Sequence, residues 1–135
     1  REVPQPVART VRRVPPETRA LLALRELEEA ALPARGQVKE HYARLSLIVR
    51  GYVEDRFPVP AVESTTDEIR SRLRAAPTLL GESEADRLLG LLEEADLVKF
   101  ARRDPGGEAA GDRVHGAKDW VGSVGARFAA SGEES

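Results

Sequence analysis

The sequence contains no cysteine, and aromatic residues make up only 4% of it. The lack of cysteine excludes disulfide frameworks, thiolate zinc sites and thiol nucleophiles, and it fits a reducing compartment. Long hydrophobic runs are absent too: no stretch approaches the ~18 apolar residues of a transmembrane helix, and no signal-peptide pattern opens the chain. We therefore expect a soluble chain, whose 135 residues bury enough surface to fold without metals or cross-links.

Charge is distributed unevenly along the chain. The net charge is −2, but residues 1–19 hold five Arg and two Glu, which puts +3 on this segment and leaves −5 on the remainder. A protein that binds nucleic acid non-specifically needs a basic surface that neutralises phosphates. Because the body of the chain is acidic, we expect no nucleic-acid partner.

The opening segment REVPQPVARTVRRVPP has four prolines and no helical periodicity. We assign residues 1–15 to a basic, Pro-rich linker, residues 16–128 to one helical domain and residues 129–135 to a disordered polar tail. The first residue is Arg1 rather than Met, which suggests either a processed product or a piece of a longer protein.

Apolar residues recur three and four positions apart through most of the chain, the spacing of amphipathic helices. The predicted helices cover residues 16–32, 37–57, 65–76, 82–95 and 112–128. The side chains expected in the core are Tyr42, Leu45, Val49, Tyr52, Leu73, Leu88, Leu92 and Trp120. The sequence therefore predicts a compact all-α bundle of about five helices, partly orthogonal, with extended or disordered termini.

The element boundaries differ in how clearly they are marked. Thr65 and Glu68 match the capping box, which predicts that the third helix starts there. Residues 96–101 fit either a last helical turn or a short extended segment, and periodicity does not separate the two. Residues 102–112 are rich in glycine and are predicted to form a loop, with Asp112 capping the last helix.

No catalytic motif is present in the sequence. His41 and His115 lie far apart and match no metal-ligand pattern, so we expect both at surface or boundary positions. Adjacent carboxylates such as Glu93 and Glu94 point about 100° apart on a helix, which is typical of a solvated face. We predict no catalytic, cofactor-binding or metal-ligating residues, no cofactor and no enzyme. An uncharacterised small enzyme remains the least favoured alternative.

The other alternative is a helix-turn-helix-like DNA-binding domain, because a helix, a break and a capped helix follow one another. Its second helix would offer Arg70, Arg72 and Arg74 to phosphates or guanines. Two features oppose this hypothesis. Asp67 and Glu68 stand at the helix end that would enter the groove, and the connector of about eight residues exceeds the usual turn of three or four.

Two blocks of the sequence resemble the cytoplasmic domains of BatD-like bacterial membrane proteins. They are YARLSLIVRGYVEDRFPVPAVESTTDEI at residues 42–69 and LLEEADLVKFA at residues 91–101, and the resemblance extends over residues 21–121. Both blocks are mainly packing patterns, so the family supplies no catalytic or binding residues to carry over. The abundant glycine in residues 102–128 departs from the usual pattern of the family.

This resemblance implies a setting for the chain. In such proteins the segment follows a single transmembrane helix, and MoxR-type AAA+ ATPases and von Willebrand factor A proteins are encoded nearby. Residues 1–15 would then be a juxtamembrane linker, whose arginines favour the cytoplasmic side of the bacterial inner membrane. We expect a non-catalytic protein–protein interaction or regulatory domain with one of those proteins as partner. The candidate contact surface is the acidic face around Glu93, Glu94 and Asp96.

Overall fold

The computed structural model describes residues 14–101 and 104–130, and all regular structure within these ranges is helical. Five α-helices follow one another: α2 (Pro16–Ala30), α3 (Val38–Arg56), α4 (Thr66–Ala75), α5 (Glu82–Ala101) and α6 (Gly107–Ala130). Two short 3-10 turns, η1 (Pro33–Arg35) and η2 (Ala61–Glu63), flank α3. The prediction of an all-α bundle with five helices is confirmed.

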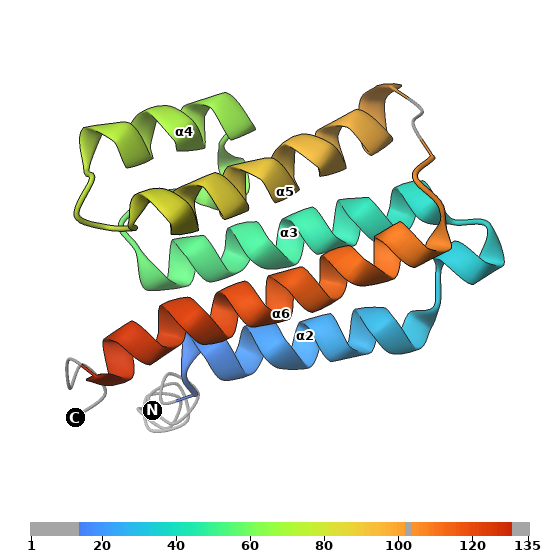
Figure 1. Ribbon diagram of the computed structural model, residues 1–135, viewed down its shortest axis with the longest axis horizontal. Coiled ribbons are helices and arrows are strands. Elements are labelled where there is room, and N and C mark those ends of the chain that lie inside the picture. The colour runs from blue at the N-terminus through green and yellow to red at the C-terminus, as the bar shows by residue number, and fades with distance from the viewer. Residues whose placement is uncertain (1–13, 102–103, 131–135) are drawn as a thin grey trace, which may run out of the picture.

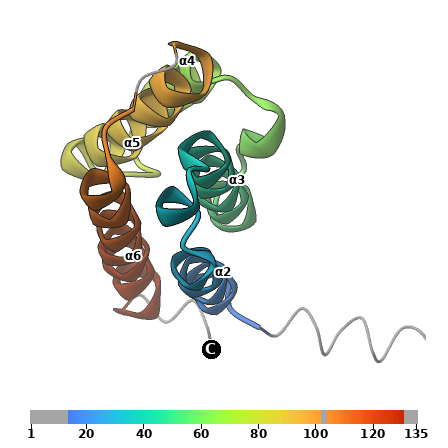
Figure 2. The same ribbon diagram turned by 90° about the vertical axis from the view of Figure 1, so that its right-hand side faces the viewer.

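Four of the helices form an up-and-down bundle. Helices α2, α3, α5 and α6 run along the long axis of the molecule in alternating directions, and α4 lies on α5 (Figure 1). The end-on view in Figure 2 places α3 between α2 on one side and α5 on the other, with α6 alongside. Helix α3 packs against α2, α5 and α6, and eight of its 19 residues are buried.

The core forms around α3, where Tyr42, Leu45 and Val49 are fully buried and Tyr52 is 2% exposed. All eight side chains predicted for the core are buried. The Trp120 ring from α6 packs against Tyr52 in a T-shaped arrangement, with 5.8 Å between the ring centroids. Its indole Nε1–H donates to the carbonyl oxygen of Glu84 at 2.9 Å, so the polar atom of this large side chain is satisfied.

The sequence signals for helix starts and breaks have physical counterparts. The Thr65 hydroxyl accepts from the Glu68 amide at 3.1 Å, and the Glu68 carboxylate accepts from the Thr65 amide at 2.9 Å. This is the predicted capping box at the start of α4. The prolines after α3 end it at Arg56, and the chain continues in extended conformation at Phe57.

The structure settles one boundary that the sequence left open and corrects another. Helix α5 continues through Ala101, so residues 96–101 are helical. Helix α6 begins at Gly107, well before the predicted cap at Asp112. Gly106, with its positive φ of 94°, makes the tight turn before the helix, so the helix starts directly after it. The other end of α6 reaches Ala130, slightly beyond the predicted end. The remainder of the predicted tail, residues 131–135, and the linker residues 1–13 lie outside the described part of the chain.

A buried ionic network ties the first and last helices to α3. Tyr52 donates its hydroxyl hydrogen to Glu17 Oε2 at 2.6 Å, and Arg56 Nε donates to the same oxygen at 2.9 Å. The Arg56 guanidinium also lies over the Phe128 ring, 4.3 Å from its centroid. Desolvation would raise the pKa of Glu17, but the hydrogen bonds from Arg56 and Tyr52 outweigh it, so this pKa is lowered and the carboxylate stays ionised.

This network requires glycine at position 125. A Cβ atom there would lie 2.4 Å from Cγ of Glu17, whose carboxylate is held in place by Tyr52 and Arg56. By contrast, a Cβ added at Gly122 on the same helix meets nothing within 4 Å. Gly122 and Gly125 therefore have different roles in α6.

We predict that Gly125→Ala lowers the free energy of unfolding by about 1–3 kcal/mol, because the added methyl group displaces Glu17. Gly122→Ala should instead stabilise the protein by about 0.5–1 kcal/mol, since alanine has the higher helix propensity. Urea denaturation followed by circular dichroism measures both. Stabilisation by both substitutions would show that α6 does not approach Glu17 closely.

Candidate functional site

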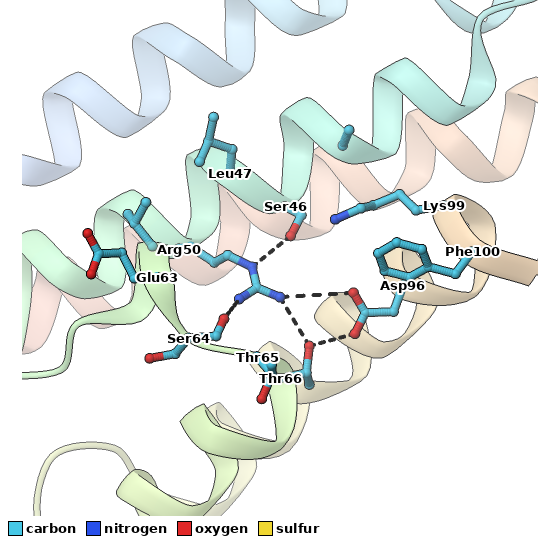
Figure 3. A pocket seen from close by; sticks show the side chains of 12 residues that line it. Ser46, Leu47, Arg50, Glu63, Ser64, Thr65, Thr66, Asp96, Lys99 and Phe100 are labelled. Carbon is cyan, nitrogen blue, oxygen red and sulfur yellow. Dashed lines mark hydrogen bonds and ion pairs between the residues drawn. The ribbon is translucent and has the colours of Figure 1, made fainter.

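The candidate site is built on a buried arginine of the central helix. Arg50 is only 8% exposed, and its guanidinium lies at the centre of Figure 3. Its Nε donates to the Ser46 hydroxyl oxygen at 2.9 Å, one turn earlier on α3. Its Nη2 donates to Thr66 Oγ1 at 3.2 Å and lies 3.9 Å from Asp96 Oδ1. We call Ser46, Arg50, Thr66 and Asp96 the Arg50 cluster.

The Arg50 cluster joins four elements of the fold. Besides its side-chain partners, Arg50 Nη1 donates to the carbonyl oxygens of Ala61 in η2 and of Ser64, just before α4. Thr66 at the start of α4 donates its hydroxyl hydrogen to Asp96 Oδ2 on α5 at 2.7 Å. One guanidinium thus fixes η2 and the start of α4 against α3 and α5.

Burial lowers the pKa of Arg50 below its ordinary value, and the nearby Asp96 carboxylate opposes this shift. Arginine keeps its proton despite such a shift, so the Arg50 guanidinium holds a permanent positive charge. A buried cation is tolerated only where it is paired and its donors are occupied. The contacts from Ser46, Ser64 and Thr66 meet that requirement.

An open hollow of about 470 Å³ lies over the Arg50 cluster and is lined by α3, η2, the start of α4 and α5. A second hollow of about 600 Å³ adjoins it. The two share Thr65, Thr66, Asp96 and Phe100 as lining residues. We call the two hollows together the groove.

Apolar side chains surround the groove although they face solvent. Six large hydrophobic residues are exposed in the described part of the chain, and four of them line the groove: Leu47, Val62, Leu97 and Phe100. We call these four the apolar rim. Phe100 is 76% exposed, the highest value of the six. A cluster of exposed apolar side chains over a hollow is typical of an interaction site, whereas single ones are common on any surface.

The three acidic residues of the predicted contact surface lie in different surroundings. Asp96 lies within the groove, and Glu93 lies at its edge in an ion pair with Arg70. Glu94 instead accepts from the Tyr42 hydroxyl at 3.1 Å and pairs with Arg113 on α6. Its side chain is 12% exposed, so the interpretation of Glu94 as part of a solvated face is wrong. The sequence did not point to Arg50 or to the apolar rim.

The arginines of the DNA-binding alternative lie on α4. Arg70 forms ion pairs with Asp67 and Glu93 and has a side chain 22% exposed, while Arg72 and Arg74 are exposed. Asp67 stands in the first turn of α4 with a side chain that is 90% exposed. An anionic duplex approaching this end of α4 would meet a carboxylate first, so the arrangement lends no support to DNA binding.

His41 is not a surface or boundary residue, and that prediction is wrong: the side chain is 3% exposed. Its Nε2 donates to the carbonyl oxygen of Ala110 at 3.1 Å, which joins α3 to α6, while Nδ1 is buried without a partner. Desolvation lowers the pKa of His41, and the hydrogen bond to Ala110 opposes this only in part. His115 is exposed as predicted, with 69% of its side chain accessible. Within the described ranges, no cluster of potential metal ligands occurs.

The lowered pKa of His41 makes stability depend on pH. The unfolded chain takes up a proton near the ordinary value of about 6.5, whereas folded His41 resists it, so the free energy of unfolding falls as the pH drops below this value. The loss reaches at most about 1.4 kcal/mol per pH unit. His41→Gln retains a donor near the Nε2 position and does not titrate, so its denaturation midpoint should change less between pH 7 and 5.5. Equal pH slopes for both proteins would refute this role.

The Arg50 cluster predicts unequal costs for two arginine substitutions in α3. Arg50→Met leaves Asp96 and several buried acceptors without their cation and should lower the free energy of unfolding by about 2–4 kcal/mol. Arg44→Met removes an exposed pair with Glu40 and should cost less than about 1 kcal/mol. Chemical denaturation compares the two, and similar costs would mean that the cluster contributes little to stability.

Among the helices of the described residues, none combines the length and the apolar character needed to span a bilayer. No protein-family model matches the chain, and no curated protein or solved structure matches it.

Proposed function

We propose that the chain is a non-catalytic protein-interaction domain that holds a segment of a partner protein in the groove over the Arg50 cluster. One observation carries this proposal: four of the six exposed large hydrophobic residues in the described part of the chain gather around one hollow. Exposed apolar side chains do not add the free energy that their burial would contribute to folding. A partner that covers them gains this free energy on binding.

The polar groups of the groove favour binding over catalysis. Arg50 and Asp96 are already committed to each other and to Thr66, so neither is free to exchange a proton with a substrate. The Ser46 hydroxyl accepts from the Arg50 guanidinium, which cannot act as a base. A rigid, satisfied floor beneath an apolar rim suits the recognition of a peptide segment.

The setting of the domain follows from the resemblance to BatD-like proteins. We propose a parent protein anchored in the bacterial inner membrane, with this domain on the cytoplasmic side and residues 1–15 as the juxtamembrane linker. The partner would then be a MoxR-type AAA+ ATPase or a von Willebrand factor A protein. Both steps are supported by the sequence blocks at residues 42–69 and 91–101.

Site-specific photo-crosslinking tests the proposed function in cells that make the full chain. A benzophenone amino acid at Phe100, in the groove, should give a discrete adduct, whereas the same probe at Leu22 on α2 should not; Leu22 is also exposed, at 50%. The adduct is identified by mass spectrometry, and the captured protein is purified. Calorimetry with that protein should show binding to the unmodified domain and to Leu22→Ser, and at least about tenfold weaker binding to Phe100→Ser. Unchanged affinity for Phe100→Ser would overturn the proposal.

A further inference from the structure

The charges around the groove differ in how far they reach the surface. The cations are the more buried groups: the side chains of Arg50 and Arg70 are 9% and 22% exposed. Carboxylates lie outside them, since the Asp67 side chain is 90% exposed and that of Glu93 is 53% exposed. Glu63, which lines the first hollow, is exposed too. A partner approaching the groove therefore meets negative charge, and the lining residues include four carboxylates against two cations.

Lys99 is the exception and does not reverse this pattern. It lines the first hollow and is partly buried, with its ammonium group 5.1 Å from the centroid of the Phe100 ring. In Figure 3 it lies beside Phe100, at the α5 edge of the groove. Across the groove, Glu63 and Asp67 are exposed on η2 and α4. Three exposed carboxylates, Glu63, Asp67 and Glu93, thus line the groove against one partly buried lysine.

On these grounds we propose, building on the proposed function, that the occupant of the groove is a short cationic amphipathic helix of a partner protein. Its apolar side chains would pack on Leu47, Val62 and Phe100, and its Lys or Arg side chains would face Asp67 and Glu93. An amphipathic helix in an apolar groove is a common mode of peptide recognition, in which side chains three and four positions apart provide the anchors. Complementary charges at the edge add specificity and speed association.

Charge disfavours two other occupants. A second copy bound face to face would bring together two surfaces with the same exposed carboxylates, because a two-fold interface uses the same patch twice. A bilayer rich in anionic lipid attracts basic segments, so it would repel the carboxylates around the apolar rim. A cationic helix satisfies the apolar rim and the carboxylates together.

Two synthetic peptides test this proposal. Each has about 18 residues with leucine at helical spacing; one carries Lys and the other Glu on its polar face, and both carry a fluorescent label. Anisotropy with the purified full chain should show at least about tenfold tighter binding of the Lys peptide. Raising the salt concentration from about 50 to 300 mM should weaken that binding several-fold.

Matched variants separate recognition from general attraction to an acidic protein. Asp67→Asn combined with Glu93→Gln should weaken the binding of the Lys peptide about three- to tenfold. The control, Glu26→Gln with Glu108→Gln, removes the same charge from exposed positions on α2 and α6 and should leave the affinity unchanged. Circular dichroism confirms that all variants are folded.

The outcomes distinguish this proposal from the proposed function. Equal binding of both peptides, no binding of either, or equal weakening by groove and control variants overturns the cationic helix. If the wild type binds both peptides equally and Phe100→Ser binds neither, the predicted positive charge of the partner helix is wrong. The groove would then remain the docking site. A dimer in sedimentation that Phe100→Ser disrupts would overturn the cationic helix in favour of self-association. Flotation with phosphatidylglycerol vesicles that requires Phe100 would overturn it in favour of lipid binding.

Discussion

A cation at 8% exposure on the most enclosed helix is the constraint on which the candidate site depends. Arg50 is stable inside the fold only because the Ser46 hydroxyl, the Ser64 carbonyl, Thr66 and Asp96 surround its guanidinium. Ser64 and Thr66 lie at the start of α4 and Asp96 lies on α5, so these contacts fix where α4 begins relative to α5. The groove is the hollow left above that arrangement, and its floor is polar but internally satisfied. Any partner must therefore gain its affinity from the apolar rim and from the charges around it.

The fold was largely predictable because it is encoded locally. Leucine and aromatic stripes at helical spacing placed the core correctly, and Thr65 with Glu68 placed the start of α4 to the residue. Boundaries without a strong local signal were less accurate. Glycine and proline near residue 105 suggested a long loop, yet tertiary packing of Ala110 and Val114 extends α6 back to Gly107.

The site was less predictable because its residues meet only through the tertiary fold. The sequence predicts Asp96 as part of an acidic face, but no periodicity indicates that it pairs with Arg50, which lies on a different helix. His41 seemed to be a surface residue because its burial depends on the arrival of Ala110 from α6. The sequence does not predict the exposure of Phe100 either, since an apolar residue on an amphipathic helix is usually assigned to the core.

The coupling between Arg50 and Asp96 is the most direct test of this account. A double-mutant cycle compares the free energies of unfolding of the wild type, Arg50→Met, Asp96→Asn and the double variant. If the cluster organises α3, α4 and α5 as described, the double variant should lose less stability than the sum of the single variants, with a coupling of about 1–3 kcal/mol. Additive effects would show that the two side chains do not support each other, and the preformed groove above them would lose its physical basis.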